Sequence, residues 1–182
     1  MKKINLVSHI AALMIVTVLC GLIYASVQQS HRSAADDPQL QIAEDVKNAI
    51  EKNQPVAKWM TDSIDISRSL SVFKTLYNRD GQALQSTGFL NGRMPSLPRG
   101  VWGFTSTHGE DVVTWQPQNG VRMAMVVEAV NSPQISFIAV GRSLKEVEKR
   151  ESNLTTMVAI AWFVCVGIII LHVLLMFFSK KN

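Results

Sequence analysis

The sequence predicts a mixed α+β domain held between two membrane-spanning helices, and three observations support this prediction. Residues 154–178 form an apolar run long enough to cross a bilayer, which takes about 20 residues. A second apolar run, residues 10–27, lies near the start of the chain. Between the two runs, a segment with helical periodicity precedes segments that alternate like strands. We therefore expect four parts: a first transmembrane helix (1–30), an extracytoplasmic domain (31–153), a second transmembrane helix (154–178) and a short cytoplasmic tail (179–182).

The distribution of charge indicates how the chain lies in a membrane. The formal net charge is +4, and Lys2, Lys3, Lys180 and Lys181 lie outside the two apolar runs. The remaining Lys and Arg residues equal the Asp and Glu residues in number. The excess is therefore the positive-inside signal of membrane helices and not a basic patch for phosphates. We expect the bacterial inner membrane, both termini in the cytoplasm and no nucleic-acid partner.

The first apolar run has two interpretations. An uncleaved anchor is favoured, because Ile23 occupies a position at which signal peptides prefer a small residue before a cut after Ala25. The alternative is a cleaved signal peptide. Both cysteines, Cys20 and Cys165, lie in the apolar runs, so we expect no disulfide in the aqueous domain and no zinc site.

The first segment of the domain is expected to be a helix that packs on a sheet. Asp36 and Asp37 precede Pro38, which is typical of an N-cap followed by proline at the first helical position. This helix is expected to end at about Asn53. Apolar residues recur on one of its faces at spacings of three and four, namely Ile42, Ala43, Val46, Ala49 and Ile50.

Five strands are expected after this helix. Asp80 and Gly81 between two apolar runs predict a hairpin with a two-residue turn. Residues 88–100, which are rich in Gly and Pro, predict a loop with a short helix after Pro98. Links of hairpin length imply an antiparallel sheet. The predicted strands are residues 71–77, 82–87, 111–116, 121–130 and 134–141.

The last segment is expected to be one long helix that leads out of the domain. Ser143 suits an N-cap, and Glu146 completes a capping box. Acidic and basic residues at spacings of three and four support the helix over residues 143–153, and only Gly167 interrupts the apolar run that follows. A continuous helix would carry a displacement of the sheet into the membrane.

Two segments of the domain have the order of elements found in a known family. Residues 76–88 (LYNRDGQALQSTG) combine a strand, an Asp-Gly turn and a strand, and residues 140–151 (VGRSLKEVEKRE) lead from a strand into a helix. Between two membrane helices, this arrangement resembles the PAS-like Cache family, the sensing ends of membrane-bound histidine kinases and chemoreceptors. The resemblance implies a ligand on the sheet face opposite the long helix. Such proteins continue into a cytoplasmic signalling module, whereas this sequence stops at Asn182, so we expect signalling through a partner.

The fourth predicted strand suggests a candidate ligand site. Its odd-numbered residues, over 121–129, form a wholly apolar face that is expected to pack on Ile42 and Val46 of the helix. The other face has an apolar middle between Arg122 and Glu128, as expected for a small-ligand cleft. The alternative is that these two are rim residues in contact with water.

Four further side chains lie in or beside the segments expected to cover this cleft: Arg93, Arg99, Trp102 and Trp115. An arginine fork matches a carboxylate, and an indole forms an apolar wall with one donor. The alternative places each tryptophan in the core and each arginine in water. The candidate ligand-binding residues are therefore Arg99, Trp115, Arg122 and Glu128.

No catalytic site, metal or cofactor is expected. His108 is the one imidazole in residues 33–153, and the sequence pairs it with no nucleophile. His9 and His172 lie in the apolar runs near the same boundary, where they could face each other. Paired histidines on neighbouring helices can bind haem, but hydrogen-bonded neutral histidines near an interface are the simpler interpretation. We therefore expect a non-enzymatic protein.

Two functions fit these features. The first is a sensor or ligand-binding subunit that signals through a membrane protein partner such as a kinase. The second is a structural or assembly subunit of a bacterial envelope complex that presents a protein-binding surface. A cavity with convergent polar groups would favour the first, and an exposed apolar patch the second. A homodimer is a further alternative, since Gly21 and Ala25 allow close helix contact.

Overall fold

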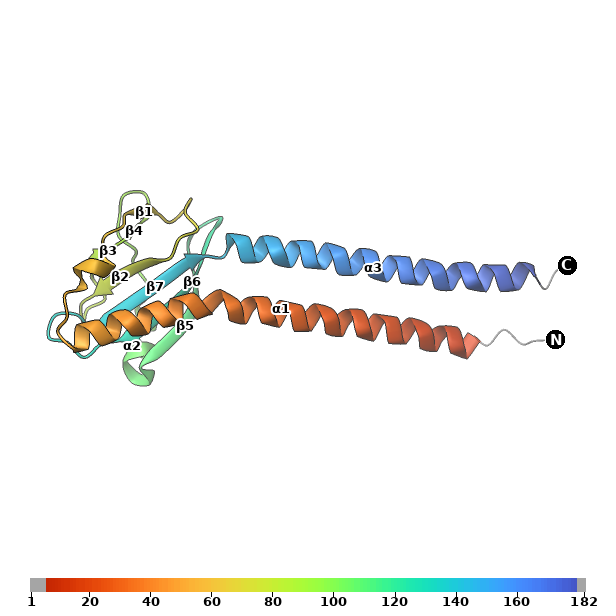
Figure 1. Cartoon of the computed structure of the whole chain (residues 1–182), viewed down its shortest axis with the longest axis horizontal. Helices are drawn as coiled ribbons and strands as arrows, with labels where there is room; N and C mark the ends of the chain where they lie inside the picture. Colours follow the sequence, from red (N-terminus) through yellow and green to blue (C-terminus); the bar gives the residue numbers. More distant parts are fainter. Residues whose placement is uncertain (1–5, 180–182) are drawn as a thin grey trace. The chain divides into compact units, whose positions relative to one another are not determined.

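The computed structural model describes residues 6–179, which form two compact units (Figure 1). One unit is Arg32–Glu148, and the other contains the described residues before 32 and after 148. Two long helices, α1 (Leu6–Glu51) and α3 (Lys145–Phe178), each contribute to both units. The terminal lysines from which the orientation is predicted lie outside the described residues.

The helix α1 is uninterrupted, which corrects the prediction of a new helix capped at Asp36 and Asp37. Pro38 lies inside α1. A proline within a helix has no N–H for the carbonyl four residues earlier, here that of Ala34. Ser33 and Ala34 are exposed, so water can replace the missing donor and the helix continues through the proline.

The C-terminal end of α1 lies close to its predicted position. Asn53 adopts a left-handed conformation with φ 55°. The N–H of Asn53 donates to the carbonyl of Ile50 (2.9 Å), and the N–H of Gln54 donates to that of Ala49 (2.8 Å). This is the Schellman pattern, in which a left-handed residue satisfies the last carbonyls of a helix.

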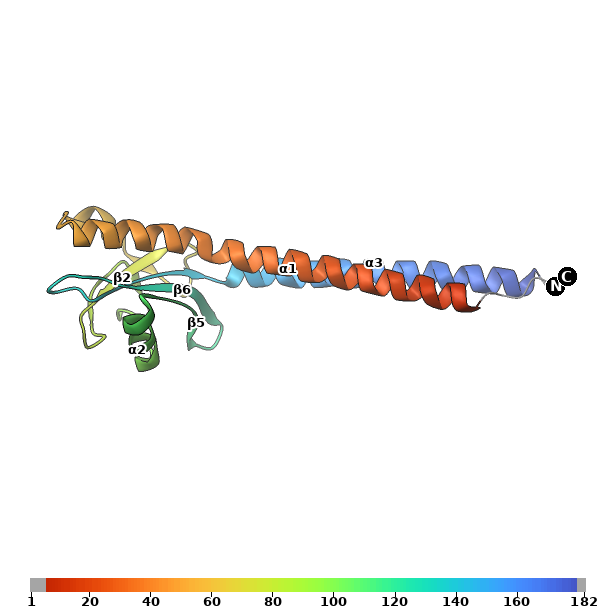
Figure 2. The same cartoon turned by 90° about the horizontal axis from the view of Figure 1, so that it is seen from below.

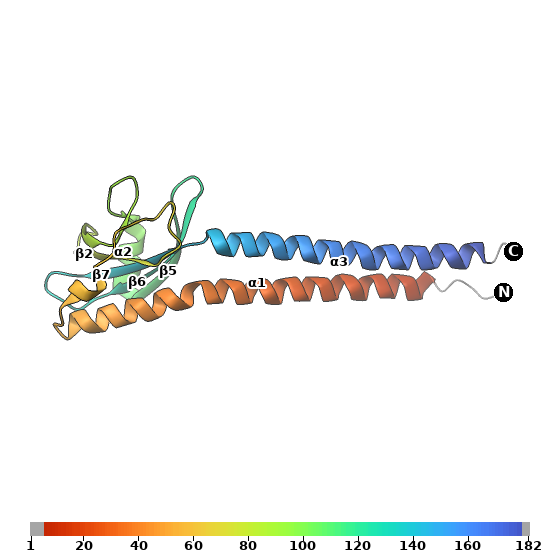
Figure 3. The ribbon, with the colours of Figure 1, turned by 45° about the horizontal axis from the view of Figure 1, so that its top comes forward.

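The central sheet has five antiparallel strands in the order β3-β2-β7-β6-β5, which confirms the predicted mixed α+β fold with a five-stranded antiparallel sheet. The last strand in sequence, β7, is the central one, and the chain passes from it into α3 (Figure 3). The strands are β2 (Phe73–Tyr77), β3 (Ala83–Ser86), β5 (Glu110–Gln118), β6 (Val121–Ala129) and β7 (Phe137–Ser143).

Two short strands lie outside the five that the sequence predicts. They are β1 (Ile64–Asp65) and β4 (Gly88–Phe89), which form a separate parallel pair. Two residues are too few to show a strand periodicity, so the sequence pattern does not reveal them. A 3-10 helix, η1 (Val56–Trp59), follows α1, and α2 (Arg99–His108) confirms the helix predicted after Pro98.

The turn between β2 and β3 is longer than predicted. Gly81 has the required positive φ of 75°, but its N–H donates to the carbonyl of Asn78 at 3.1 Å. The Asn78 side-chain oxygen accepts from the N–H groups of Asp80 (3.0 Å) and Gln82 (2.8 Å). These bonds define a three-residue turn that ends in a left-handed glycine, because the asparagine side chain satisfies the extra backbone donor.

The two faces of the sheet are covered by different helices, with α1 and α2 on opposite sides (Figure 2). The odd-numbered residues of β6 share a core with Trp102 of α2, whereas even-numbered Val126 shares a core with Val46 of α1. The apolar face of α1 therefore packs on the sheet as predicted, but the prediction that the odd-numbered face of β6 lies under it is wrong. Both faces of β6 are covered and apolar, so the pattern of side chains along the strand does not show which face lies against α1.

The second unit contains the part of α1 before residue 32 and the part of α3 after residue 148. Both helices are long and apolar enough to cross a membrane. Contacts between them include a hydrogen bond from the Trp162 indole N–H to the Thr17 hydroxyl at 3.0 Å and a stack of the His9 and His172 rings with centroids 5.5 Å apart. The two histidines therefore do face each other.

Candidate ligand site

The four residues predicted to bind a ligand do not form one site. Arg122 and Glu128 belong to the β6 face that α1 covers, whereas Trp115 lies in the core on the α2 face. Arg99 is the first residue of α2 and is exposed. The prediction that Arg122 and Glu128 line a cleft opposite the long helix is wrong, because the two faces of β6 are the reverse of those expected.

Glu128 forms an ion pair between the sheet and α1. Its carboxylate lies 3.1 Å from Nζ of Lys47, and the residue is only 5% exposed. Burial raises the pKa of Glu128, the bond to Lys47 lowers it, and the like charges of Glu110 and Glu44 raise it further, with a net upward shift. The arrangement joins helix to sheet and leaves this carboxylate no contact with a cavity on the α2 face.

We predict that Glu128→Gln makes the protein more stable at neutral pH. A carboxyl group whose pKa is raised on folding contributes stability below its unfolded pKa and loses that contribution as the pH rises through the folded value. Wild type and variant should therefore melt together near about pH 4, while the variant melts higher near pH 7. Thermal unfolding of the full chain between these pH values is the measurement.

Glu110→Gln is the matched control for this prediction, because Glu110 lies directly opposite Glu128 on β5 but is exposed. Its gain in melting temperature near pH 7 should have the same direction but be smaller than that of Glu128→Gln, because the charge of Glu110 is only one of the smaller causes that raise the pKa of Glu128. A Glu128→Gln variant that melts lower than the wild type at neutral pH would show that the ion pair with Lys47 outweighs the cost of burying the charge.

Arg122 connects the sheet to the start of α3. Its guanidinium pairs with Glu148 in the first turn of α3, and its backbone carbonyl accepts a hydrogen bond from the N–H of Leu144 at 2.9 Å. The Ser143 hydroxyl accepts from the N–H of Lys145 at 3.3 Å, but the first helical bond runs from the N–H of Glu148 to the carbonyl of Leu144. The N-cap is therefore Leu144, one residue after the predicted position. The first turn of α3 is therefore held to β6 by both backbone and side chain.

The α2 face carries an open cavity of about 440 Å³, and it brings together two side chains singled out in the sequence, Arg93 and Trp115. Arg93 is exposed, while Trp115 is 8% exposed and forms part of the wall. The cavity is lined by Leu90, Asn91, Arg93, Met94, Pro95, Ser96, Trp115, Pro117 and Gln118.

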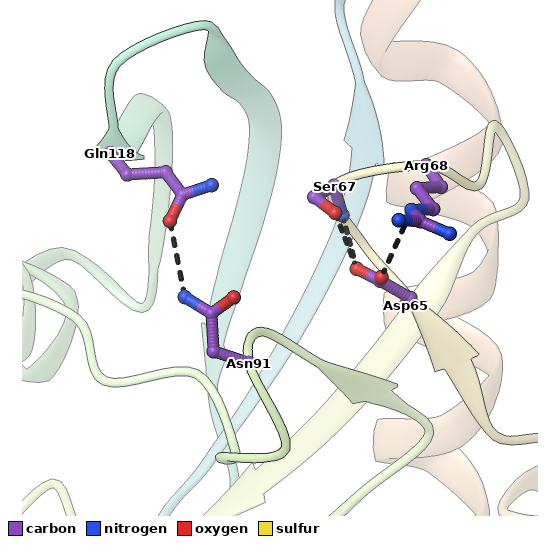
Figure 4. Close-up of polar contacts among 5 residues, drawn as sticks. All are labelled: Asp65, Ser67, Arg68, Asn91 and Gln118. Atoms are coloured by element: carbon purple, nitrogen blue, oxygen red, sulfur yellow. Dashed lines mark hydrogen bonds and ion pairs between the residues drawn. The ribbon is translucent and has the colours of Figure 1, made fainter.

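A tight turn places Arg93 at this cavity. Leu90 and Arg93 exchange two backbone hydrogen bonds, and between them Asn91 (φ 52°) and Gly92 (φ 75°) are both left-handed. This is a type I′ turn, for which Asn-Gly is the preferred dipeptide. The Asn91 amide donates to the side-chain oxygen of Gln118 in β5 at 3.2 Å (Figure 4). The Asn-Gly pair was the sequence signal that would have located this turn.

The following part of the loop is held by Tyr77 of β2. Its hydroxyl donates to the carbonyl of Pro95 at 3.0 Å, and burial raises the pKa of Tyr77, so the group stays a neutral donor. The Trp102 ring packs against Tyr77 and Phe137, with centroids 4.6 and 5.1 Å away. Trp102 is therefore a core residue and not part of a ligand wall.

Asp65 stabilises a local turn through its carboxylate. One of its carboxylate oxygens accepts from the hydroxyl (2.6 Å) and the N–H (2.9 Å) of Ser67, and the other lies 3.8 Å from Nε of Arg68 (Figure 4). These bonds, mainly those from Ser67, hold the pKa of Asp65 below its usual range. The carboxylate stabilises the turn after β1.

The lining of the Arg93 cavity defines the kind of ligand that it suits. The planar fork of Arg93 matches a carboxylate, and Trp115 and Pro117 supply apolar surface. The NH₂ group of Asn91 donates to the side-chain oxygen of Gln118. This leaves the Asn91 oxygen and the Gln118 NH₂ group to orient a ligand. The combination fits a small organic carboxylate with an apolar body.

A second open cavity of about 590 Å³ lies where the turn between β2 and β3 meets the start of β7. Its charged residues, Arg79 and Asp80, are exposed, and Asn78 is already committed to the turn. Its one aromatic residue, Phe137, is buried in the core, so this cavity lacks the apolar wall of the first. It is the weaker candidate.

No family model and no curated protein matches this sequence. The fold has a long helix on a five-stranded antiparallel sheet, together with two apolar helices, and is consistent with a sensor-like domain. Within residues 6–179, no group of three or more His, Cys, Asp or Glu side chains is placed to hold a metal ion. His108 stacks on Phe104, with ring centroids 4.0 Å apart.

Proposed function

We propose that this protein is a membrane-anchored sensor or ligand-binding subunit with a PAS-like extracytoplasmic domain, which passes a change in that domain to a membrane protein partner. The observation that carries the proposal is the connection between sheet and helix. The central strand β7 leads directly into α3, and Arg122 of β6 holds the first turn of that helix through Glu148.

The proposed signal starts at the Arg93 cavity. A carboxylate bound by Arg93 would draw the loop of residues 90–97 toward β5, the strand that carries Trp115. β5 is hydrogen-bonded to β6, and β6 to β7, so a shift of β5 reaches Arg122 and the start of α3. A ligand that binds one arrangement of this sheet edge better than another shifts the population accordingly.

The membrane placement belongs to the proposal. The part of α1 before residue 32 and the part of α3 after residue 148 would span the bacterial inner membrane, with both termini in the cytoplasm. The partner would then receive the signal from α3 within or beside the bilayer. A signalling kinase is one class of partner that fits.

The test uses the full-length chain with a photo-crosslinking residue at Phe163, which is 67% exposed on α3. A panel of small aliphatic and aromatic carboxylates is first screened for an increase in melting temperature. We expect Arg93→Gln to abolish that increase, while Arg99→Gln keeps it because Arg99 does not line the cavity. The same carboxylate should change the pattern of crosslinks formed by residue 163 in intact membranes.

Two glycines inserted after Glu151 are the control for transmission. They should cost about 1 kcal/mol of helix stability each, leave the rise in melting temperature intact and remove the change in crosslinks. A crosslinking response that survives the insertion would contradict transmission through α3. Absence of any carboxylate effect in the wild type would argue instead for the assembly subunit that presents a protein-binding surface.

A further inference from the structure

We propose that the free edge of β5 binds an extended segment of a partner polypeptide, which adds a sixth strand to the sheet. This goes beyond ligand sensing, because it assigns a protein-binding surface that does not use the Arg93 cavity. β5, a strand of nine residues, lies at one end of the sheet, and among residues 6–179 its strand partner is β6 alone. The other end strand, β3, has four residues.

The register shows which peptide groups of β5 point outward. The N–H of Ala129 donates to the carbonyl of Gly109, so the hydrogen-bonded pairs with β6 continue at residues 111, 113 and 115. In an antiparallel ladder, the residues between them direct their N–H and C=O groups away from the partner strand. Glu110, Val112 and Thr114 therefore present a row of donors and acceptors that matches a peptide backbone.

This edge has few of the features that normally prevent strand pairing. Edge strands are usually protected by lysines, prolines, bulges or a covering element. In β5 the register shift and Pro117 come only after Trp115, and the preceding six residues pair regularly with β6. Val112 is 45% exposed, and Glu110 and Thr114 are exposed beside it. The outward peptide groups and an apolar side chain are thus available together.

The acidic residues of β5 and the direction in which its strand runs indicate which polypeptide fits the edge. β5 carries two acids at its start, Glu110 and Asp111, and no base, so a matching segment has Lys or Arg at that end and β-prone apolar residues beyond it. A second copy fits poorly, because symmetric pairing of two β5 strands is antiparallel. It would point the two β7 strands, and the starts of both α3 helices, in opposite directions, which two chains in one membrane cannot adopt.

The test is a selection with phage-displayed random ten-residue peptides on the full-length chain in lipid nanodiscs. Thr114→Pro removes only an outward N–H, and proline is tolerated at such edge positions, so the native ladder is kept. Thr114→Ala is the matched control that retains the N–H. We expect enriched peptides to alternate apolar residues and to carry Lys or Arg at one end. Their binding should fall at least about tenfold in Thr114→Pro and persist in Thr114→Ala.

Amide hydrogen exchange locates the bound peptide. The amides of Glu110, Val112 and Thr114 should become protected when an enriched peptide binds. Val112→Lys is the second variant, for use if Thr114→Pro fails to fold. It leaves the backbone unchanged and is expected to weaken peptide binding. The proposal is overturned if no peptide is enriched, if protection falls elsewhere, or if the edge variants bind as well as the wild type.

The oligomeric state of the wild type and of Thr114→Pro shows whether the β5 edge pairs with a second copy of the chain. If the wild type dimerises and Thr114→Pro makes it monomeric, the occupant is a second copy and the proposed partner segment is wrong. The carboxylate response at Arg93 is measured on the same variants. If Thr114→Pro keeps the carboxylate response but binds peptide as well as the wild type, this proposal fails while the sensor function stands.

Discussion

Replacing Gly81 with alanine is expected to destabilise the Arg32–Glu148 unit by about 3 kcal/mol, for two separate reasons. The residue has φ 75°, a conformation that costs a residue with a Cβ about 1–2 kcal/mol. In addition, a Cβ at this position would lie 2.3 Å from Nε1 of Trp102. Trp102 is packed between Tyr77 and Phe137, so it has little freedom to move away.

Gly92→Ala separates the two causes, because Gly92 has the same φ of 75° but a Cβ there would meet no neighbouring side chain within 4 Å. It should cost only the backbone term, about 1–2 kcal/mol. Urea unfolding of the full chain in detergent, followed by tryptophan fluorescence, compares the two variants. Equal losses in both would mean that Trp102 does not press on Gly81.

Gly141→Ala is expected to cost about 2–3 kcal/mol, although this glycine needs no special backbone conformation in β7. A Cβ there would lie 2.2 Å from Sδ of Met125 and 2.5 Å from Cζ of Phe73. The methionine can change rotamer, but the phenylalanine ring is 1% exposed and cannot shift without disturbing the core. The loss should appear in the same urea titration.

Two further variants test this explanation. Gly103→Ala in α2 has nothing within 4 Å of its Cβ and should raise stability by about 0.5–1 kcal/mol, as alanine does within a helix. Combining Gly141→Ala with Phe73→Leu should cost less than the sum of the single losses, because the smaller side chain makes room. Strict additivity of the two losses would locate the strain elsewhere.

Much of the fold was determined by local sequence. Asp80-Gly81 and the other short links separate strands that can only be antiparallel neighbours, and five such strands were found. The spacing of Ala43 and Val46 correctly marked the face of α1 that packs on the sheet, since a helix must bury its apolar stripe. Ser143 marked the start of the last helix to within one residue, since α3 begins at Lys145 after Leu144.

Local sequence also determined part of the candidate site. Arg93 and Trp115 were two of the four side chains expected beside the cleft, and both line the same cavity. Of the four candidate ligand-binding residues, however, only Trp115 lines it, and Arg93 was not among them. Their partners were not predicted, because the contacts join residues distant in sequence. The bond between Asn91 and Gln118 depends on a loop folding back on the end of β5, and the bond from Tyr77 to Pro95 on that loop crossing the sheet.

The tertiary structure alone decided which face of β6 lies against α1. Both faces are apolar because helices and loops cover both, so residues such as Met125 and Val126 are equally suited to either core. The choice moved Glu128 from the predicted cleft to an ion pair with Lys47, a residue that sequence pattern did not connect with it. Likewise, Pro38 marks a helix start by local rules, but the helix continued because the freed carbonyl is open to water.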